Sequence, residues 1–298
     1  ISTPKSLGQY RIVCVGGSTT YTTNVDTYKN SYPYLLEKKL IDLGHENIEI
    51  INAGVGNADT WYSLINLQFR ILDLSPDMVI LYHGDNDLES RLVYPFEFYR
   101  GDNTGRIQPI INKVLVEDKI FSNFISIKFI IHQIPIIKKL FEINSLGSLE
   151  NLFSSTTSVY DLYFKQKNDN SYPEGIFTIV DGVDILNKNT LIYTKRNLEN
   201  MILISEANNI NTILATFAYS PISNETNSKL YKIGIDEYNQ MIKELALKKN
   251  KLFFDFSAAM SSDIKYWSED GVHVNEMGAN VKSELFASFI SNYLKSLK

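Results

Sequence analysis

Segments typical of strands alternate with segments typical of helices along this chain. Five runs rich in Val, Ile, Leu and Phe lie near residues 10–16, 47–53, 77–83, 211–217 and 251–256. Helical patterns lie between and after them, near residues 31–43, 59–73, 195–209, 233–249 and 276–296. This alternation predicts βαβ units, and therefore an α/β fold with three αβα layers around a parallel sheet. Five strands fit the flavodoxin-like order 2-1-3-4-5.

A serine follows the first predicted strand. The apolar run that ends at Val15 is followed by Gly16 and Gly17, and Ser18 then begins a helical segment. Ligands of open parallel sheets bind at the carboxyl ends of the strands. The pattern therefore presents the Ser18 hydroxyl on a sharp turn, as a candidate nucleophile. Taken alone, the same residues also fit a tight turn before a helix N-cap.

A histidine near the other end of the chain is a candidate base. His273 follows Asp270 by three residues, with Gly271 between them. On a tight loop this spacing lets Asp270 bond one imidazole nitrogen while the other faces a nucleophile. Serine is a poor nucleophile near neutral pH, so it needs such a base, and the base needs an orienting carboxylate. The alternative is a solvated surface turn.

Two further loops at strand ends carry candidate donors for a negatively charged oxygen. The third predicted strand ends in Gly84-Asp85-Asn86-Asp87, and the Asn86 amide is a neutral donor suited to the oxygen of a tetrahedral intermediate. The loop after the second predicted strand offers a backbone N–H to the same oxygen, from Gly56 or Asn57. The alternative for Asn86 is an Asx turn.

Together these four blocks resemble the SGNH hydrolases, the GDSL-like esterases and acylhydrolases. The resemblance covers about residues 10–90 and 190–298 and is carried by residues 16–20, 52–57, 84–87 and 270–273. It implies that Ser18 is the nucleophile and that Asp270 and His273 complete a catalytic triad. It also implies an oxyanion hole made of the Ser18 N–H, a second-block N–H and the Asn86 side chain.

Two positions depart from the family pattern. The first block reads Gly-Gly-Ser instead of Gly-Asp-Ser, which leaves the nucleophile Ser18 unchanged. In the second block, Asn57 stands where the family usually has a glycine, with Gly56 directly before it. Asn adopts left-handed backbone conformations more readily than most residues, so both positions remain candidates for the backbone donor.

The resemblance implies a serine esterase that cleaves a small acyl ester, with an acetyl group on a carbohydrate as the first expectation. An O-acyltransferase that moves the acyl group onto a glycan through the same acyl-enzyme is the first alternative. A catalytically silent glycan-binding module is the second. The expected partner is a small-molecule or glycan ester, and no cofactor is expected.

Composition excludes several other classes of function. The net charge of −5 and the sequence pI near 5.5 argue against binding to nucleic acids and to anionic lipid surfaces. Cys14 is the one cysteine, so the chain forms no internal disulfide and no cysteine-based zinc site. The four histidines are scattered and indicate no metal site. A nucleotide-binding Rossmann-like protein would need a phosphate-binding motif, which the sequence lacks.

The predicted site draws on both ends of the chain, which favours a single domain over residues 1–298 with an insertion near residues 90–190. We expect this insertion to govern substrate choice. Its Ile- and Phe-rich stretch from Ile120 to Phe141 predicts a helical cap, with a mobile lid or a flap in peripheral contact with a membrane as the alternative. The chain begins at Ile1 without methionine, which favours an extracytoplasmic or membrane-anchored protein over a cytoplasmic one.

Overall fold

The computed structural model describes residues 4–93, 96, 99–102 and 181–297. The chain divides into two compact units, Ile1–Arg91 with Thr190–Lys298 and Leu92–Asn189. The first unit carries every predicted site residue. The second unit includes helix α10 (Gly182–Lys188), which begins where the Asp181 side chain accepts a hydrogen bond from the Val183 N–H. The predicted cap from Ile120 to Phe141 lies outside the described residues, and the domain assignment stays a prediction.

The first unit is built on a five-stranded parallel sheet with the order β2-β1-β3-β4-β5. This confirms the order predicted from the sequence. The strands are β1 (Tyr10–Gly16), β2 (Ile48–Gly54), β3 (Met78–Tyr82), β4 (Asn211–Ala215) and β5 (Leu252–Phe254).

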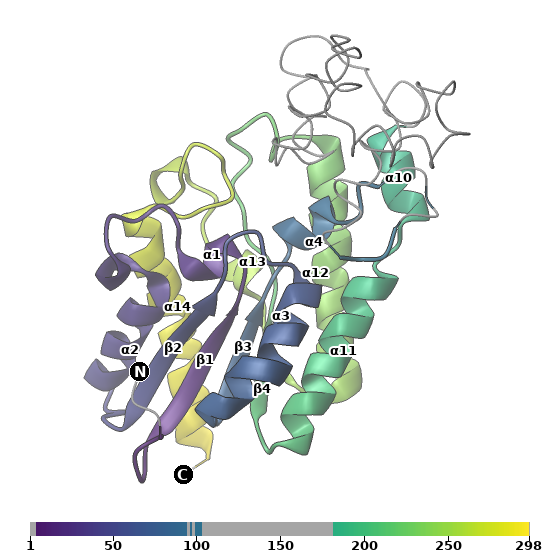
Figure 1. Ribbon diagram of the computed structural model, residues 1–298. Coiled ribbons are helices and arrows are strands. Elements are labelled where there is room, and N and C mark those ends of the chain that lie inside the picture. The colour runs from purple at the N-terminus through teal and green to yellow at the C-terminus, as the bar shows by residue number, and fades with distance from the viewer. Residues whose placement is uncertain (1–3, 94–95, 97–98, 103–180, 298) are drawn as a thin grey trace, which may run out of the picture. The chain divides into compact units, whose positions relative to one another are not determined.

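Helices cover both faces of this sheet (Figure 1). On one face lie α2 (Tyr32–Asp42) and α14 (Glu276–Ser296), and on the other lie α3 (Thr60–Asn66), α11 (Ile192–Ala207) and α12 (Lys229–Lys249). The three αβα layers predicted from the alternating pattern are therefore present. The last helix begins at the residue predicted for it because the Asn275 side chain accepts a hydrogen bond from the Gly278 N–H.

Three helices differ from their predicted bounds by three residues or more. Helix α11 begins at Ile192 instead of residue 195. The helix predicted over residues 59–73 is α-helical only in α3, and it continues as a π-helical turn over Leu67–Ile71 and a 3-10 turn over Leu72–Leu74. Helix α12 begins at Lys229 instead of residue 233, because the Ser228 side chain accepts from the Tyr231 N–H and caps the helix there.

The strands end level with one another on the edge where the site was predicted. Gly16 of β1 pairs with Gly54 of β2 and with Tyr82 of β3, so the loops after all three strands leave the same edge. Short helices begin directly beyond the sheet there: α1 (Ser18–Tyr21), α4 (Asp85–Glu89) and α13 (Phe256–Ala259). Two 3-10 turns lie in the longer loops, at Tyr28–Asn30 and Ile264–Tyr266.

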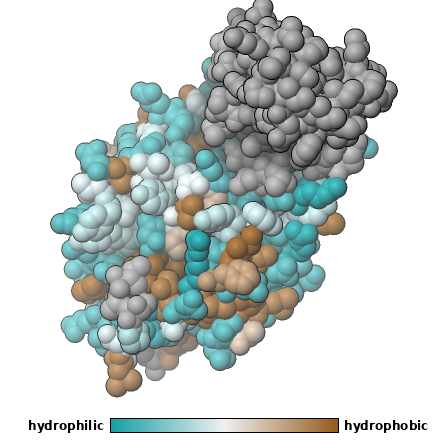
Figure 2. Space-filling view, viewed as in Figure 1, coloured by the Kyte–Doolittle hydropathy of each residue, from teal (hydrophilic) through white to brown (hydrophobic). Residues whose placement is uncertain are grey.

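The core of this unit lies between the central strands and their helices. All residues of β3 are buried, as are those of β1 after Tyr10, which explains why both strands read as continuous apolar runs. Each fully buried aliphatic or aromatic side chain of this kind contributes about 1.5–3 kcal/mol to stability. Polar residues spread over the visible face of the unit, with apolar ones between them (Figure 2). None of the helices in the described ranges is long and apolar enough to cross a membrane.

Candidate functional site

Ser18 is placed by a close approach between β1 and the helix that follows it. A Cβ atom on Gly16 would lie 2.2 Å from Thr20 Oγ1 and 2.3 Å from the Tyr82 carbonyl oxygen, so only glycine fits there. Ser18 is the first residue of α1, where a backbone N–H has no acceptor within the helix. The hydroxyl and the N–H of Ser18 therefore both belong to the turn at the sheet edge.

His273 lies on a loop that is shaped by Asp270. One carboxylate oxygen of Asp270 accepts from the backbone N–H groups of Val272 and His273, each at 2.8 Å. Gly271 has φ +72° and a Cβ there would lie 2.2 Å from the Ser220 carbonyl oxygen, so this tight turn requires glycine. The loop is thereby fixed directly before α14, which begins at Glu276.

A continuous hydrogen-bonded chain joins the three predicted residues. The second Asp270 oxygen lies 2.8 Å from His273 Nδ1, and His273 Nε2 lies 2.7 Å from Ser18 Oγ. A carboxylate only accepts, so Nδ1 carries the ring proton and Nε2 accepts from the serine hydroxyl. Burial opposes ionisation of Asp270, but the hydrogen bonds from the His273 ring and from the two backbone N–H groups hold the pKa of its carboxyl below the usual value.

Asn86 lies in the first turn of α4, directly against the Ser18 turn. Its Nδ2 atom donates to the Ala58 carbonyl oxygen at 2.9 Å, and the second N–H of the amide has no acceptor among the described residues. A Cβ atom on Gly17 would lie 2.4 Å from the same Nδ2 atom. The Gly-Gly-Ser variation thus leaves room for the Asn86 amide beside the residue before Ser18.

The loop after β2 makes a tight turn at Gly56 and Asn57. The Ala58 N–H donates to the Val55 carbonyl oxygen at 3.1 Å, and Asn57 has φ 60° in the left-handed region. Asn57 therefore adopts the conformation that the family pattern assigns to a glycine. Both Gly56 and Asn57 are exposed. Which of their N–H groups faces the Ser18 hydroxyl stays a prediction.

No protein-family model matches this sequence, and no curated protein matches it. Solved structures match nearly the whole chain. A lipase/acylhydrolase from Enterococcus faecalis has a TM-score of 0.55 and 17% identity, covering 96% of this chain and 97% of its own. A catalytic mutant of an acetylxylan esterase from Geobacillus stearothermophilus has a TM-score of 0.53 and 14% identity, covering 96% of both chains. A GDSL-like lipase from Bacteroides thetaiotaomicron has a TM-score of 0.52 and 13% identity, covering 100% of this chain and 93% of its own.

The chain has the SGNH hydrolase fold. At these identities the likeness concerns the fold, and the roles of individual residues depend on the geometry given above. The four sequence blocks that resemble SGNH hydrolases all lie at one edge of the sheet. Ser18, His273 and Asp270 are joined by hydrogen bonds, and Asn86 lies beside the Ser18 turn.

Two buried carboxyl groups, Asp59 and Asp87, lie next to the Asn86 loop in this fold. Asp59 caps α3 through the Tyr62 N–H, and Asp87 accepts from the N–H and the hydroxyl of Thr60. Burial, together with the nearby Asp59 charge, raises the pKa of Asp87 to about 8. Burial lowers the pKa of His83, whose Nδ1 lies 3.8 Å from Asp87, to about 3, so this ring is neutral. Burial and the neutral His83 ring therefore both favour the protonated form of Asp87 at neutral pH.

Sequence reasoning did not assign these two carboxyls. Asp59 follows Ala58, which accepts from the Asn86 amide, and Asp87 follows Asn86 itself. Both acids therefore flank the same contact. The signal in the sequence is an acidic residue next to each predicted oxyanion loop, two residues after Asn57 and directly after Asn86. The burial of these acids depends on contacts between distant segments.

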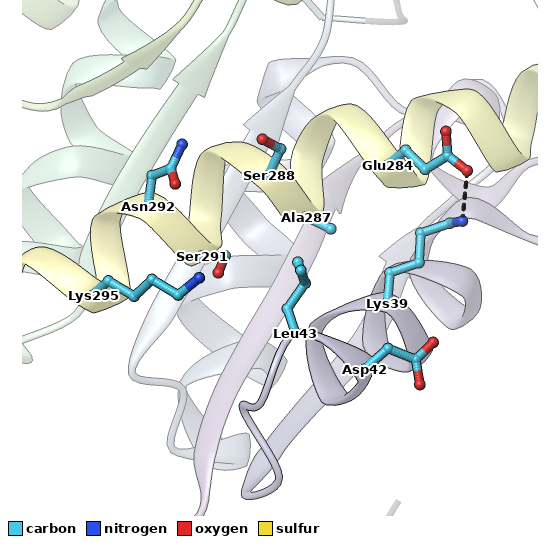
Figure 3. Close-up of a pocket in the computed structure, with 9 residues that line it drawn as sticks. All are labelled: Lys39, Asp42, Leu43, Glu284, Ala287, Ser288, Ser291, Asn292 and Lys295. Atoms are coloured by element: carbon cyan, nitrogen blue, oxygen red, sulfur yellow. Dashed lines mark hydrogen bonds and ion pairs between the residues drawn. The ribbon is translucent and has the colours of Figure 1, made fainter.

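A hollow of about 360 Å³ lies between α2 and α14 (Figure 3). Lys39 and Glu284 form an ion pair of 2.9 Å across it. Its lining includes none of the predicted site residues; the lining residues are Lys39, Asp42, Leu43, Glu284, Ala287, Ser288, Ser291, Asn292 and Lys295. Within the described parts of the chain, no group of three or more His, Cys, Asp or Glu side chains is arranged to hold a metal ion.

Proposed function

We propose that the protein is a serine esterase in which Ser18 is the nucleophile, His273 the general base and Asp270 the carboxylate that orients it. The hydrogen-bonded chain of 2.7 Å and 2.8 Å contacts supports these roles most directly. Such a chain raises the nucleophilicity of a hydroxyl that is unreactive at neutral pH. The SGNH fold supports the same roles, because it brings both ends of the sequence to one edge of the sheet.

In the first half of the reaction, His273 Nε2 takes the proton of the Ser18 hydroxyl while Oγ attacks the ester carbonyl carbon. The carbonyl π-electrons move onto the oxygen and give a tetrahedral oxyanion. The imidazolium then gives its proton to the leaving alcohol oxygen as the C–O bond breaks. The products are a free alcohol and an acyl group on Ser18.

Three donors are proposed to stabilise the oxyanion: the Ser18 N–H, the free N–H of the Asn86 amide and a backbone N–H from Gly56 or Asn57. Neutral donors fixed in advance cost no reorganisation when charge develops on the oxygen. In the second half, His273 activates a water molecule that attacks the acyl group. The carboxylic acid leaves as Ser18 regains its proton.

The proposed substrate is a small acyl ester, with an acetyl group on a carbohydrate as the first choice. Three of the structures that share the fold are acetyl xylan esterases, which supports this choice. Others are described as lipases, so longer acyl chains belong in the same test. The proposed partner is a small-molecule or glycan ester.

Turnover of p-nitrophenyl acetate by the wild-type protein and by Ser18→Ala tests this function. We expect turnover in the wild type and a loss of several orders of magnitude in Ser18→Ala, because the hydroxyl takes part in covalent chemistry. Ser288→Ala, at an exposed serine of α14, is the matched control and should be fully active. Equal activity in Ser18→Ala would refute the proposed nucleophile.

Acyl-chain length and acceptor chemistry sharpen the test. We expect p-nitrophenyl acetate and an acetylated xylan oligosaccharide to be cleaved faster than p-nitrophenyl octanoate. A free sugar added to the assay separates hydrolysis, which yields acetate, from transfer, which yields an acetylated sugar detectable by mass. If acetylated sugar is the main product, the protein is an acyltransferase that uses the same acyl-enzyme, and the proposed hydrolase activity is wrong.

A further inference from the structure

Lys282 is a buried lysine that the proposed chemistry does not use. It belongs to α14 and is 1% exposed. Its Nζ atom lies 3.9 Å from the ring centre of Tyr82, 4.1 Å from that of Tyr32 and 5.5 Å from that of Phe256. These rings come from β3, α2 and α13, so the amine ends in an aromatic cage built by three separate elements. An ammonium group is attracted to the negative faces of such rings.

No carboxylate faces this amine among the residues that the structure describes. The titratable groups around it are Cys14 of β1, Tyr32 of α2 and Tyr82 of β3. Burial raises the pKa of the Cys14 thiol to about 12 and holds the pKa values of both tyrosines well above their usual range, so all three are neutral. Burial also lowers the pKa of Lys282 well below its usual range. A buried amine with no counter-charge is unfavourable for folding, which favours a functional reason for its presence.

Among the described residues the amine makes one polar contact, and that contact is with the nucleophile turn. Lys282 Nζ donates to the carbonyl oxygen of Thr19 at 3.0 Å, and Thr19 directly follows Ser18. Helix α1 is only one turn long, so it gains little stability from its own hydrogen bonds. The neighbouring carbonyl of Ser18 accepts from Thr22 and Thr23, within the same segment. The Thr19 carbonyl is instead held by a residue 263 positions away.

The same helix follows the loop that carries the base. Helix α14 begins at Glu276, three residues after His273, and Asn275 caps it. Lys282 therefore ties the turn of the nucleophile to the helix that directly follows the His273 loop. The 2.7 Å contact between Ser18 Oγ and His273 Nε2 joins the same nucleophile turn to the loop directly before α14.

We propose that Lys282 is a positioning residue that holds the Ser18 turn in register with His273, a role that rests on the proposed esterase function. Without the Nζ donor, the Thr19 carbonyl has no other partner within the described ranges, and the first turn of α1 can move away from His273. A displacement of about 1 Å at reacting atoms can cost about 100-fold in rate.

Lys282→Met tests this role, because methionine fills a similar volume but has no donor and no charge. We expect kcat for p-nitrophenyl acetate to fall by about 10- to 100-fold while KM changes by less than about 2-fold. The rate at which a fluorophosphonate labels Ser18 should fall in parallel. Lys295→Met, the same substitution at an exposed position of α14, should change neither rate.

Lys282→Gln keeps a donor on a shorter side chain, and its kcat should lie between those of wild type and Lys282→Met. Each turnover rate is divided by the amount of Ser18 that the fluorophosphonate labels at completion, so that misfolded protein is not counted. Urea unfolding is measured on the same preparations. If Lys282→Met does not fold, Lys282→Gln alone decides the question. Variants that unfold at lower urea but keep the wild-type kcat would overturn the positioning role. A wild-type protein that neither labels nor turns over ester would instead overturn the esterase function itself.

Discussion

Replacing Asn86 with alanine should affect catalysis and stability by separate amounts that can be worked out from its contacts. The amide has two N–H groups, of which one donates to the Ala58 carbonyl oxygen at 2.9 Å. The other is the proposed oxyanion donor. Alanine removes both donors at once, and the two losses act on different measurements.

The loss of the oxyanion donor should lower kcat by about 10²–10³-fold, which corresponds to about 2.7–4 kcal/mol of transition-state stabilisation. KM should change little, because the charge on the oxygen develops after binding. Loss of the other donor leaves the Ala58 carbonyl oxygen without its hydrogen-bond partner. Ala58 is only 2% exposed. Leaving a buried acceptor unpaired costs about 1–3 kcal/mol of folding free energy, and each kcal/mol lowers Tm by about 2–4 °C at this size.

The assays are p-nitrophenyl acetate kinetics and thermal unfolding on the same preparation. Asn292→Ala, at an exposed position of α14, is the matched control and should leave both values unchanged. A rise in KM with an unchanged kcat would mean that Asn86 contacts the substrate in its ground state. In that case the proposed oxyanion hole would be wrong.

Three further substitutions test other parts of the site. Asp270→Asn removes the carboxylate that fixes the His273 Nδ1 proton, so kcat should fall by about 10⁴-fold, and wild-type kcat in this variant would contradict the orienting role. Gly17→Ala places a Cβ 2.4 Å from Asn86 Nδ2 and should lower kcat toward the Asn86→Ala level, whereas an unchanged kcat would show that the amide moves without cost. Asp87 stays protonated in the folded protein to about pH 8 but ionises near pH 4 when unfolded, so its contribution to stability is complete below about pH 4 and is lost as pH rises toward 8. Urea unfolding should therefore show a fall of up to about 1.4 kcal/mol per pH unit that Asp87→Asn abolishes, and a slope retained in that variant would refute the buried acid.

The sheet could be predicted from the sequence because its strands are short, apolar and regularly spaced by helices. The central strands β1 and β3 are buried on both faces, so their sequences are nearly continuous runs of apolar residues. The order of the strands then brings the loops after β1, β2 and β3 to one edge without further information. The same edge receives the loop after β5, so the topology allows His273 to reach Ser18, and the structure shows the contact.

The structure around the site depends on contacts that the sequence does not carry locally. Asp85, Asn86 and Asp87 are turn formers, yet they begin the short helix α4, because helix formation there depends on packing rather than on propensity. The change of α3 into π-helical and 3-10 turns has no local sequence signal that we recognise. The approach of Gly17 to Asn86 joins two loops that are far apart in the chain. The start of α12 at Lys229 does have a local signal in the sequence, since Ser228 before it is a favoured N-cap residue.

Covalent labelling tests the central role of Ser18 most directly. A fluorophosphonate reacts with an activated serine by forming a bond between phosphorus and Oγ as fluoride leaves, so the labelled peptide identifies the nucleophile by its mass. We predict one label per chain, on the peptide that contains Ser18, and its absence from Ser18→Ala and His273→Ala. A label on any other serine, or equal labelling of Ser18→Ala, would contradict the proposed nucleophile.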